Sequence, residues 1–307
     1  MSAETALEDQ GRMKYWVAAT LEPTLLMAVL LVSLGTVVAW QQRSVRVDFY
    51  VLAMIGTVLS QLAVNVLNDY FDFKSGVDLK TQKTPFSGGS RFLAESLLPP
   101  EGLYRVGTIS LGIAAVIGIY FVIARGWLLL PLLLFAGVAV YFYTPVFARL
   151  NLGEFMAGFN LGPLAVLGAA FVQTGGYSLT AFLAAVPPGL MIANVLLLNE
   201  VPDLEADRAG GRRNLVTTLG RREAVRVYTI LEIVAYLWIV AAVGLKLLPP
   251  WALLGLLSLP FALGAIQKSR SPFTAAEAMI PALGLNIAAA YATTFFLIMG
   301  FVLNRVL

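Results

Sequence analysis

Long apolar runs separated by polar connections occur from one end of the chain to the other. Most of these runs contain the roughly 20 helical residues that cross a hydrocarbon core about 30 Å thick. The expected spans are about 16–40, 48–70, 103–124, 127–148, 152–174, 180–201, 223–245, 250–266 and 277–302. Lipid offers no hydrogen-bond partner to a free backbone N–H or C=O, so each run should be helical. The pattern predicts an all-α polytopic membrane protein with about nine transmembrane helices in one bundle.

The composition agrees with a membrane location and narrows the possible chemistry. Of the 307 residues, 59% are hydrophobic and 13% are charged, whereas soluble domains are about 45–50% apolar and about 25% charged. The chain has no cysteine and no histidine, which excludes disulfides, thiolate nucleophiles and histidine bases. A metal would be bound by carboxylate, amide and carbonyl oxygens, which are the ligands of Mg²⁺, Ca²⁺ and Mn²⁺.

The positive charges predict an orientation in the membrane. If the N-terminus is cytoplasmic, most of the 21 Lys and Arg residues fall on the cytoplasmic side, as they do in inner-membrane proteins. Residues 1–14 are then a cytoplasmic tail, and residues 15–307 form a single transmembrane domain. The two long polar loops, 68–102 and 199–222, also lie on the cytoplasmic side of this multi-pass protein.

Two of the expected spans end in similar polar sequences. The second ends N-V-L-N-D-Y-F-D at 65–72, and the sixth ends N-V-L-L-L-N-E-V-P-D at 194–203. In each, an Asn precedes an Asp by four residues, and a further acid follows. The residues are Asn68, Asp72 and Asp78 in the first motif, and Asn199, Asp203 and Asp207 in the second. Four spans separate the two copies, and an even number preserves the side of the membrane. The two motifs are therefore expected to face each other across the bundle.

The residue types of the motifs suit a metal that binds together with a phosphate. Residues four apart lie on one face of a helix, so each motif offers an amide oxygen and carboxylates to one small volume. Such oxygen ligands suit Mg²⁺ bound jointly with a phosphate-bearing substrate, and two faces could hold two ions that bridge a diphosphate. Nearby cations are the candidates for diphosphate binding: Lys74, Lys83, Arg91, Arg208 and Arg212. A solvated helix end is the alternative for one motif alone, and the duplication favours a metal site.

In these residues the chain resembles the UbiA superfamily of intramembrane prenyltransferases, in the menaquinone-pathway (1,4-dihydroxy-2-naphthoate polyprenyltransferase) and UBIAD-type branch. N-D-Y-F-D-F-K-S-G-V-D (68–78) is similar to the first Asp-rich motif of that family, and N-E-V-P-D-L-E-A-D-R-A-G-G-R-R-N-L (199–215) to the second. Y-T-P (143–145), L-G-E (152–154) and G-P-L-A-V (162–166) resemble the segment across its fourth and fifth spans.

The resemblance implies a nine-helix bundle around a central cavity that is open to lipid. A polyprenyl diphosphate would bind with its head at the two motifs through Mg²⁺, for which Mn²⁺ could substitute, and with its tail in the bilayer. Metal or diphosphate ligands would be Asn68, Asp72, Asn199, Asp203 and Asp207, supported by Asp69 and Asp78. Tyr143 would lie near the allylic carbon. The catalytic residues implied are Asp72, Asp203, Asp207 and Tyr143.

The chain departs from the menaquinone-pathway pattern at two places. The usual Arg-Pro near the first span is replaced by Thr20-Leu21-Glu22-Pro23, and the second motif reads Asn199-Glu200-Val201-Pro202-Asp203 where Asn-Asn-x-Arg-Asp is common. These changes leave the metal chemistry intact but leave the acceptor open.

The resulting hypothesis is Mg²⁺-dependent transfer of a polyprenyl group to a small aromatic acceptor in menaquinone-like lipoquinone biosynthesis. Another acceptor of the same chemistry, such as a glycerol-phosphate lipid, 4-hydroxybenzoate or homogentisate, is the first alternative. A cation-coupled secondary transporter is an alternative of a different class, although its acids are expected near the bilayer midplane. The expected partners are the two substrates and the lipid bilayer, with no nucleic acid.

Overall fold

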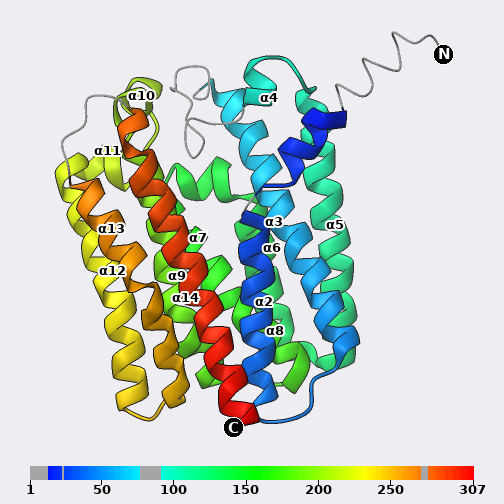
Figure 1. The fold of residues 1–307 in the computed structure, drawn as a ribbon. Helices are drawn as coiled ribbons and strands as arrows, with labels where there is room; N and C mark the ends of the chain where they lie inside the picture. The colour runs from blue at the N-terminus through cyan, green and yellow to red at the C-terminus, as the bar shows by residue number, and fades with distance from the viewer. Residues whose placement is uncertain (1–12, 23, 77–90, 271–275) are drawn as a thin grey trace.

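The computed structural model describes residues 13–22, 24–76, 91–270 and 276–307, and in these residues the chain is helical with no strand. Figure 1 shows the long helices running side by side between two ends of one bundle. Besides Met13–Thr20, the α-helices are α2 (Thr24–Trp40), α3 (Val47–Ser75), α4 (Arg91–Ala94), α5 (Pro100–Arg125), α6 (Leu130–Tyr141), α7 (Gly153–Phe159), α8 (Ala165–Thr174), α9 (Leu179–Glu200), α10 (Leu204–Gly210), α11 (Leu215–Leu219), α12 (Arg221–Gly244), α13 (Leu259–Ser269) and α14 (Ile280–Val306). Tighter or wider helical turns are η1 (Trp127–Leu129), η2 (Tyr143–Ala148), η3 (Asn160–Leu164), η4 (Pro250–Ser258) and η5 (Ala276–Met279).

The helices match the apolar runs of the sequence. Within the described residues, 7 helices are long and apolar enough to cross a membrane: Val47–Ser75, Pro100–Arg125, Gly153–Thr174, Leu179–Glu200, Arg221–Gly244, Pro250–Ser269 and Glu277–Val306. The bent pair Met13–Thr20 and Thr24–Trp40 makes up to 8, and Trp127–Tyr141 is a shorter apolar helix. The all-α polytopic fold is confirmed, whereas the count of nine, the lipid-open cavity and the single-domain division stay predictions.

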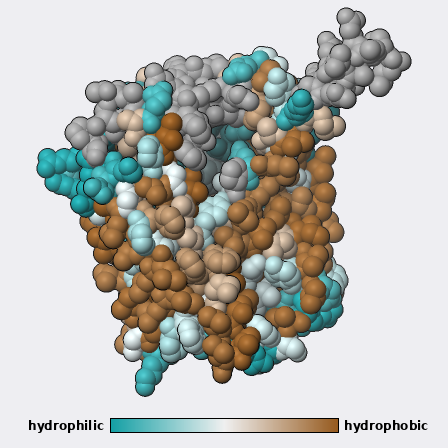
Figure 2. Space-filling model, viewed as in Figure 1, coloured by the Kyte–Doolittle hydropathy of each residue, from teal (hydrophilic) through white to brown (hydrophobic). Residues whose placement is uncertain are grey.

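The outer surface of the bundle is apolar over its middle and polar toward its ends. Figure 2 shows large hydrophobic side chains over much of the face in view, with hydrophilic residues gathered near the two ends. On α5, the exposed residues include Ile109, Ile113 and Val116, which are spaced as one helix face. A face of this kind is stable against hydrocarbon and would be costly in water, so it suits contact with lipid tails.

Small residues let α9 pack closely on the end of α7 and on η3, which follows it. A Cβ atom added at Gly162 in η3 would lie 2.4 Å from the Gly189 Cα in α9, and one at Gly158 would lie 2.5 Å from the Gly189 carbonyl oxygen. Only residues without a side chain allow two backbones to come this close, which is a common contact between membrane helices. The second motif at the end of α9 is therefore carried on a helix fixed by backbone contact.

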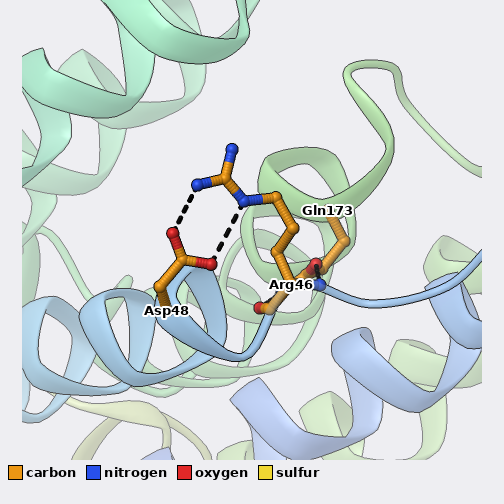
Figure 3. A network of polar contacts seen from close by, with 3 residues as sticks. All are labelled: Arg46, Asp48 and Gln173. Atoms are coloured by element: carbon orange, nitrogen blue, oxygen red, sulfur yellow. Dashed lines mark hydrogen bonds and ion pairs between the residues drawn. The ribbon is translucent and has the colours of Figure 1, made fainter.

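A polar clamp fixes the opposite end of the bundle. The Arg46 backbone N–H donates to Gln173 Oε1 at 2.9 Å, and Gln173 Nε2 donates back to the Arg46 carbonyl at 3.0 Å. The Arg46 guanidinium pairs with the Asp48 carboxylate, as Figure 3 shows, and lies 3.7 Å from the centre of the Phe49 ring. The two hydrogen bonds with Gln173 hold the start of α3 against the end of α8.

Candidate functional site

The two acidic motifs come together at one end of the bundle, which is the upper end in Figure 1, where α3 ends and α10 begins. Arg212, from the loop after α10, approaches the first motif: its Nη1 lies 3.5 Å from Asp72 Oδ2. Both side chains are largely buried, with 25% of Arg212 and 12% of Asp72 exposed. The expectation that the motifs face each other therefore agrees with this contact.

The first motif lies on the last turns of α3, whose C-cap residue Gly76 has the left-handed conformation (φ 77°). Asn68 Nδ2 donates to Asp72 Oδ2 at 3.1 Å and to Thr144 Oγ1 at 2.8 Å. The i, i+4 spacing thus does place Asn68 and Asp72 on one helix face. Thr144 is buried in η2 and was given no role from the sequence. It orients the Asn68 amide from the opposite side.

The second motif is not one continuous helix. The α9 helix ends at Glu200, and a turn over Val201–Asp203 leads to Asp203 as the N-cap residue of α10 (φ −89°, ψ 0°). The expectation that Asn199, Asp203 and Asp207 share a single helix face was wrong for this reason. Pro202 has no N–H to continue the helical hydrogen bonds, so a break is favoured at this position.

Asp207 is buried, and its two carboxylate oxygens differ in environment. Asp207 Oδ2 accepts a hydrogen bond from Asn214 Nδ2 at 2.8 Å, while Oδ1 is buried with no hydrogen-bond partner. Burial raises the pKa of the Asp207 carboxyl, whereas Arg212 and the Asn214 hydrogen bond act to lower it. Burial would by itself lower the pKa of the Arg212 guanidinium, but the Asp72 and Asp207 carboxylates outweigh it and raise that pKa.

Buried oxygens at the second motif are available as ligands for a cation. Asn199 Oδ1, Asp207 Oδ1 and Glu200 Oε2 are all buried without a hydrogen-bond donor, and such groups are costly unless a ligand satisfies them. Across the described part of the chain, however, no three acidic side chains form a group able to hold a metal ion. Buried amide and carboxylate oxygens of this kind suit an ion that also takes oxygens from its substrate, as Mg²⁺ does with a phosphate.

A buried glutamate joins the site from α7. Glu154, within the L-G-E sequence, is 3% exposed, and its Oε1 accepts from the Leu215 backbone N–H at 2.8 Å. Tyr143 lies close by, since a Cβ at Gly153 would be 3.5 Å from the Tyr143 hydroxyl oxygen. Sequence reasoning gave Glu154 no role. The signal in the sequence was an acidic residue at the start of an apolar run.

Two of the predicted diphosphate-binding cations pair with neighbouring acids on the surface. Lys74 Nζ lies 3.6 Å from Glu101 Oε1 on α5, and Arg208 Nη1 lies 3.7 Å from Glu205 Oε1. Arg91 begins α4. Asp69 is half-buried on α3. Asp78 and Lys83 lie outside the described residues, so their roles stay predictions.

Comparison with known proteins identifies the family. A model of the UbiA prenyltransferase family matches residues 25–280. The chain belongs to this family. It is 30% identical over 249 residues to 1,4-dihydroxy-2-naphthoate octaprenyltransferase of Bacillus subtilis, covering 80% of this chain and 78% of the relative. Vertebrate proteins named UbiA prenyltransferase domain-containing protein 1 are also similar. The resemblance to the menaquinone-pathway and UBIAD-type branch is confirmed.

Solved structures of UbiA homologues have the same fold. A homologue from Aeropyrum pernix K1 gives a TM-score of 0.71 at 16% identity, covering 92% of this chain and 98% of that one. A homologue from Archaeoglobus fulgidus bound to DMAPP and Mg²⁺ gives 0.60 at 13% identity, covering 90% and 96%. This UbiA-family chain is therefore a polytopic membrane prenyltransferase, and the transporter alternative is set aside.

Proposed function

We propose that the protein transfers a polyprenyl group from a polyprenyl diphosphate to a small aromatic acceptor in menaquinone-like lipoquinone synthesis, with Mg²⁺ as cofactor. The contact between Arg212 and Asp72 carries the proposal, because Asp207 of the second motif acts on the same guanidinium at the end of an apolar bundle. The naphthoate octaprenyltransferase relative supports an aromatic acceptor. The homologue bound to DMAPP and Mg²⁺ supports the donor and the metal.

In this proposal the two motifs hold the diphosphate head. Asn68, Asp72, Asn199, Asp203 and Asp207 are the ligands for Mg²⁺, which would neutralise charge on the departing diphosphate; Mn²⁺ would fill the same role. The Arg212 guanidinium turns from Asp72 toward the diphosphate oxygens, where a charge-assisted hydrogen bond is strongest. Asp69, Asp78, Lys74, Lys83, Arg91 and Arg208 have the supporting roles predicted from the sequence.

The reaction breaks the C–O bond between the prenyl group and the diphosphate, which leaves with the electron pair. A ring carbon of the acceptor forms the new C–C bond, and the ring then loses a proton. Tyr143 lies beside the allylic carbon, where its aromatic face stabilises positive charge and its position in the bundle excludes water. Asp203 or Asp207 polarises the acceptor or accepts its proton. The N-terminus and both motif loops face the cytoplasm at the inner membrane.

The test supplies purified protein with Mg²⁺, a labelled polyprenyl diphosphate and a panel of hydroxylated aromatic acceptors. Asp72→Asn and Asp207→Asn are each expected to lower kcat/KM at least about 100-fold, through lost transition-state stabilisation of about 2.7 kcal/mol. Asp48→Asn is the matched control, because Asp48 is an exposed acid at the far end of α3. Full transfer by either active-site variant, or a loss of the same size in the control, would contradict the proposal.

A further inference from the structure

The oxygen and the nitrogen of the buried Asn214 side-chain amide have different hydrogen-bond partners. Its Oδ1 accepts from the Thr217 backbone N–H at 2.7 Å, and its own backbone N–H donates to Thr217 Oγ1 at 2.9 Å, so it caps α11. Its Nδ2 donates to Asp207 Oδ2 at 2.8 Å. The side chain is only 3% exposed, and Asp207 is 1% exposed. The cap therefore fixes the orientation of the Asn214 amide, and this amide fixes the orientation of the Asp207 carboxylate.

The start of α11 is in turn held from another part of the bundle. Glu154 Oε1 on α7 accepts from the Leu215 N–H, which directly follows Asn214 in the chain. On the other side, the Arg212 N–H donates to the Asp207 carbonyl at 2.9 Å, which closes the turn at the end of α10. Asp207 and Asn214 thus face each other across a turn whose two ends are both anchored.

We propose that Asn214 is a positioning residue for the metal and diphosphate site. Its amide N–H occupies Asp207 Oδ2 and so leaves Oδ1, which has no partner in the described structure, as the oxygen directed to the ligand. Glu154 supports this arrangement by holding the backbone at Leu215. The nature of the ligand rests on the proposed function, whereas the contacts of Asn214 with Asp207 and Thr217 do not depend on it.

Helix capping alone does not account for an asparagine here. Ser and Thr cap helices about as well as Asn through a single side-chain oxygen, but neither has a second group that reaches Asp207 while the oxygen caps. A residue that supports a metal ligand in this way typically affects metal affinity by about 10- to 100-fold. The two roles can therefore be separated by substitution.

The experiment compares Asn214→Ser, which keeps a cap and removes the donor, with Asn214→Ala, which removes both. Ser178→Ala is the matched control, because Ser178 Oγ accepts from the Ala181 N–H and caps α9 at its other end. Two readouts are taken for each protein. One is the Mg²⁺ concentration that gives half-maximal prenyl transfer. The other is the shift in melting temperature caused by Mg²⁺ with inorganic diphosphate, which needs no turnover.

Without ligand, Asn214→Ser is expected to melt below wild type, because the buried Asp207 Oδ2 loses its donor, but above Asn214→Ala, which also loses the cap. It should need at least about 10-fold more Mg²⁺ in both readouts. kcat at saturating Mg²⁺ should change much less than the Mg²⁺ requirement. Ser178→Ala should melt at a lower temperature with an unchanged Mg²⁺ requirement. A wild-type Mg²⁺ response in Asn214→Ser, with a defect only in Asn214→Ala, would show that Asn214 is a cap alone. If wild type transfers no prenyl group, the proposed function fails, while the melting shift still tests Asn214.

Discussion

Arg212 Nη1 and Asp72 Oδ2 lie 3.5 Å apart and join the two halves of the candidate site. Arg212 follows Asp207 of the second motif in the chain, and Asp72 belongs to the first motif. Asp207 and Glu200 lie close enough to act on the same guanidinium. One cation therefore compensates carboxylates that come from both motifs.

Arg212→Gln tests this relationship. Removing one partner of a largely buried pair leaves Asp72 uncompensated, and we expect a loss of about 3 kcal/mol in the free energy of unfolding in metal-free buffer. The KM for the prenyl diphosphate should also rise, and Mg²⁺ alone should stabilise the variant more than wild type, because the metal replaces the lost cation beside the carboxylates. Thermal unfolding in detergent and steady-state kinetics measure the two effects. Arg226→Gln is the control, since Arg226 pairs with Glu223 on the exposed surface of α12 at 2.5 Å and should cost less than about 1 kcal/mol.

Thr144→Val tests the support of the first motif. The substitution keeps the shape but removes the oxygen that accepts from Asn68 Nδ2, which is worth about 1 kcal/mol, or about 5-fold. The Mg²⁺ concentration for half-maximal activity should rise by roughly this factor. Thr144→Ser retains the acceptor oxygen and should behave like wild type. Equal behaviour of the two variants would refute the role of Thr144.

Gly162→Ala tests the close approach of η3 to α9. The added Cβ would lie 2.4 Å from the Gly189 Cα, so the two backbones must separate. We expect a loss of about 1–3 kcal/mol from overpacking and a fall in activity, because α9 carries Asn199. Gly137→Ala in α6 is the control, as nothing lies within 4 Å of its new Cβ, and Ala favours a helix by about 0.5–1 kcal/mol over Gly. Melting temperature and monodispersity in detergent distinguish the two.

The pH dependence of Mg²⁺ binding follows from the buried Asp207 carboxyl. Burial raises its pKa, so Asp207 binds a proton at a higher pH than an exposed Asp, whose pKa is about 3.9. Because Mg²⁺ needs the ionised carboxylate, the Mg²⁺ requirement should rise as the pH falls, beginning above the range of an exposed Asp. Without Mg²⁺ the sign reverses: the group favours the folded state at low pH, and this contribution is lost as the pH rises through the raised pKa. Melting curves across pH, with and without Mg²⁺ and diphosphate, would show opposite slopes, and parallel curves would contradict this assignment.

The sequence was sufficient where an interaction stays within one regular helix. Helical spacing predicted that Asn68 and Asp72 share a face, and the two side chains are hydrogen bonded. The same rule failed between Asn199 and Asp207, because Pro202 ends the helix and its effect outweighs the spacing. Because Pro202 is present in the sequence, the rule of helical spacing applies to α9 only as far as Asn199 and not to Asp203 or Asp207.

Contacts that depend on how the bundle packs could not be predicted in this way. The pairing of Lys74 with Glu101 depends on the packing of α3 beside α5, which no residue spacing indicates. Glu154 reaches Leu215, and nothing in the spacing of these two residues indicates that they meet. Asn214 reaches Asp207 only because the chain turns at Gly211, which has φ 73°. Each of these contacts depends on the path of the chain in three dimensions, which the spacing of residues in the sequence does not predict.

The length of α3 has a consequence for the depth of the candidate site relative to the membrane surface. From Val47, near the Arg46 clamp, to Asn68 the helix rises about 30 Å at roughly 1.5 Å per residue, which is the thickness of a typical hydrocarbon core. If Val47 lies at one membrane surface, the length of α3 brings the Asn68 amide to the opposite surface. A thicker bilayer would draw this amide among the acyl chains, and a thinner one would lift it into water. The enzyme would thus work best in membranes of one thickness, and lipid chain length becomes a determinant of its activity.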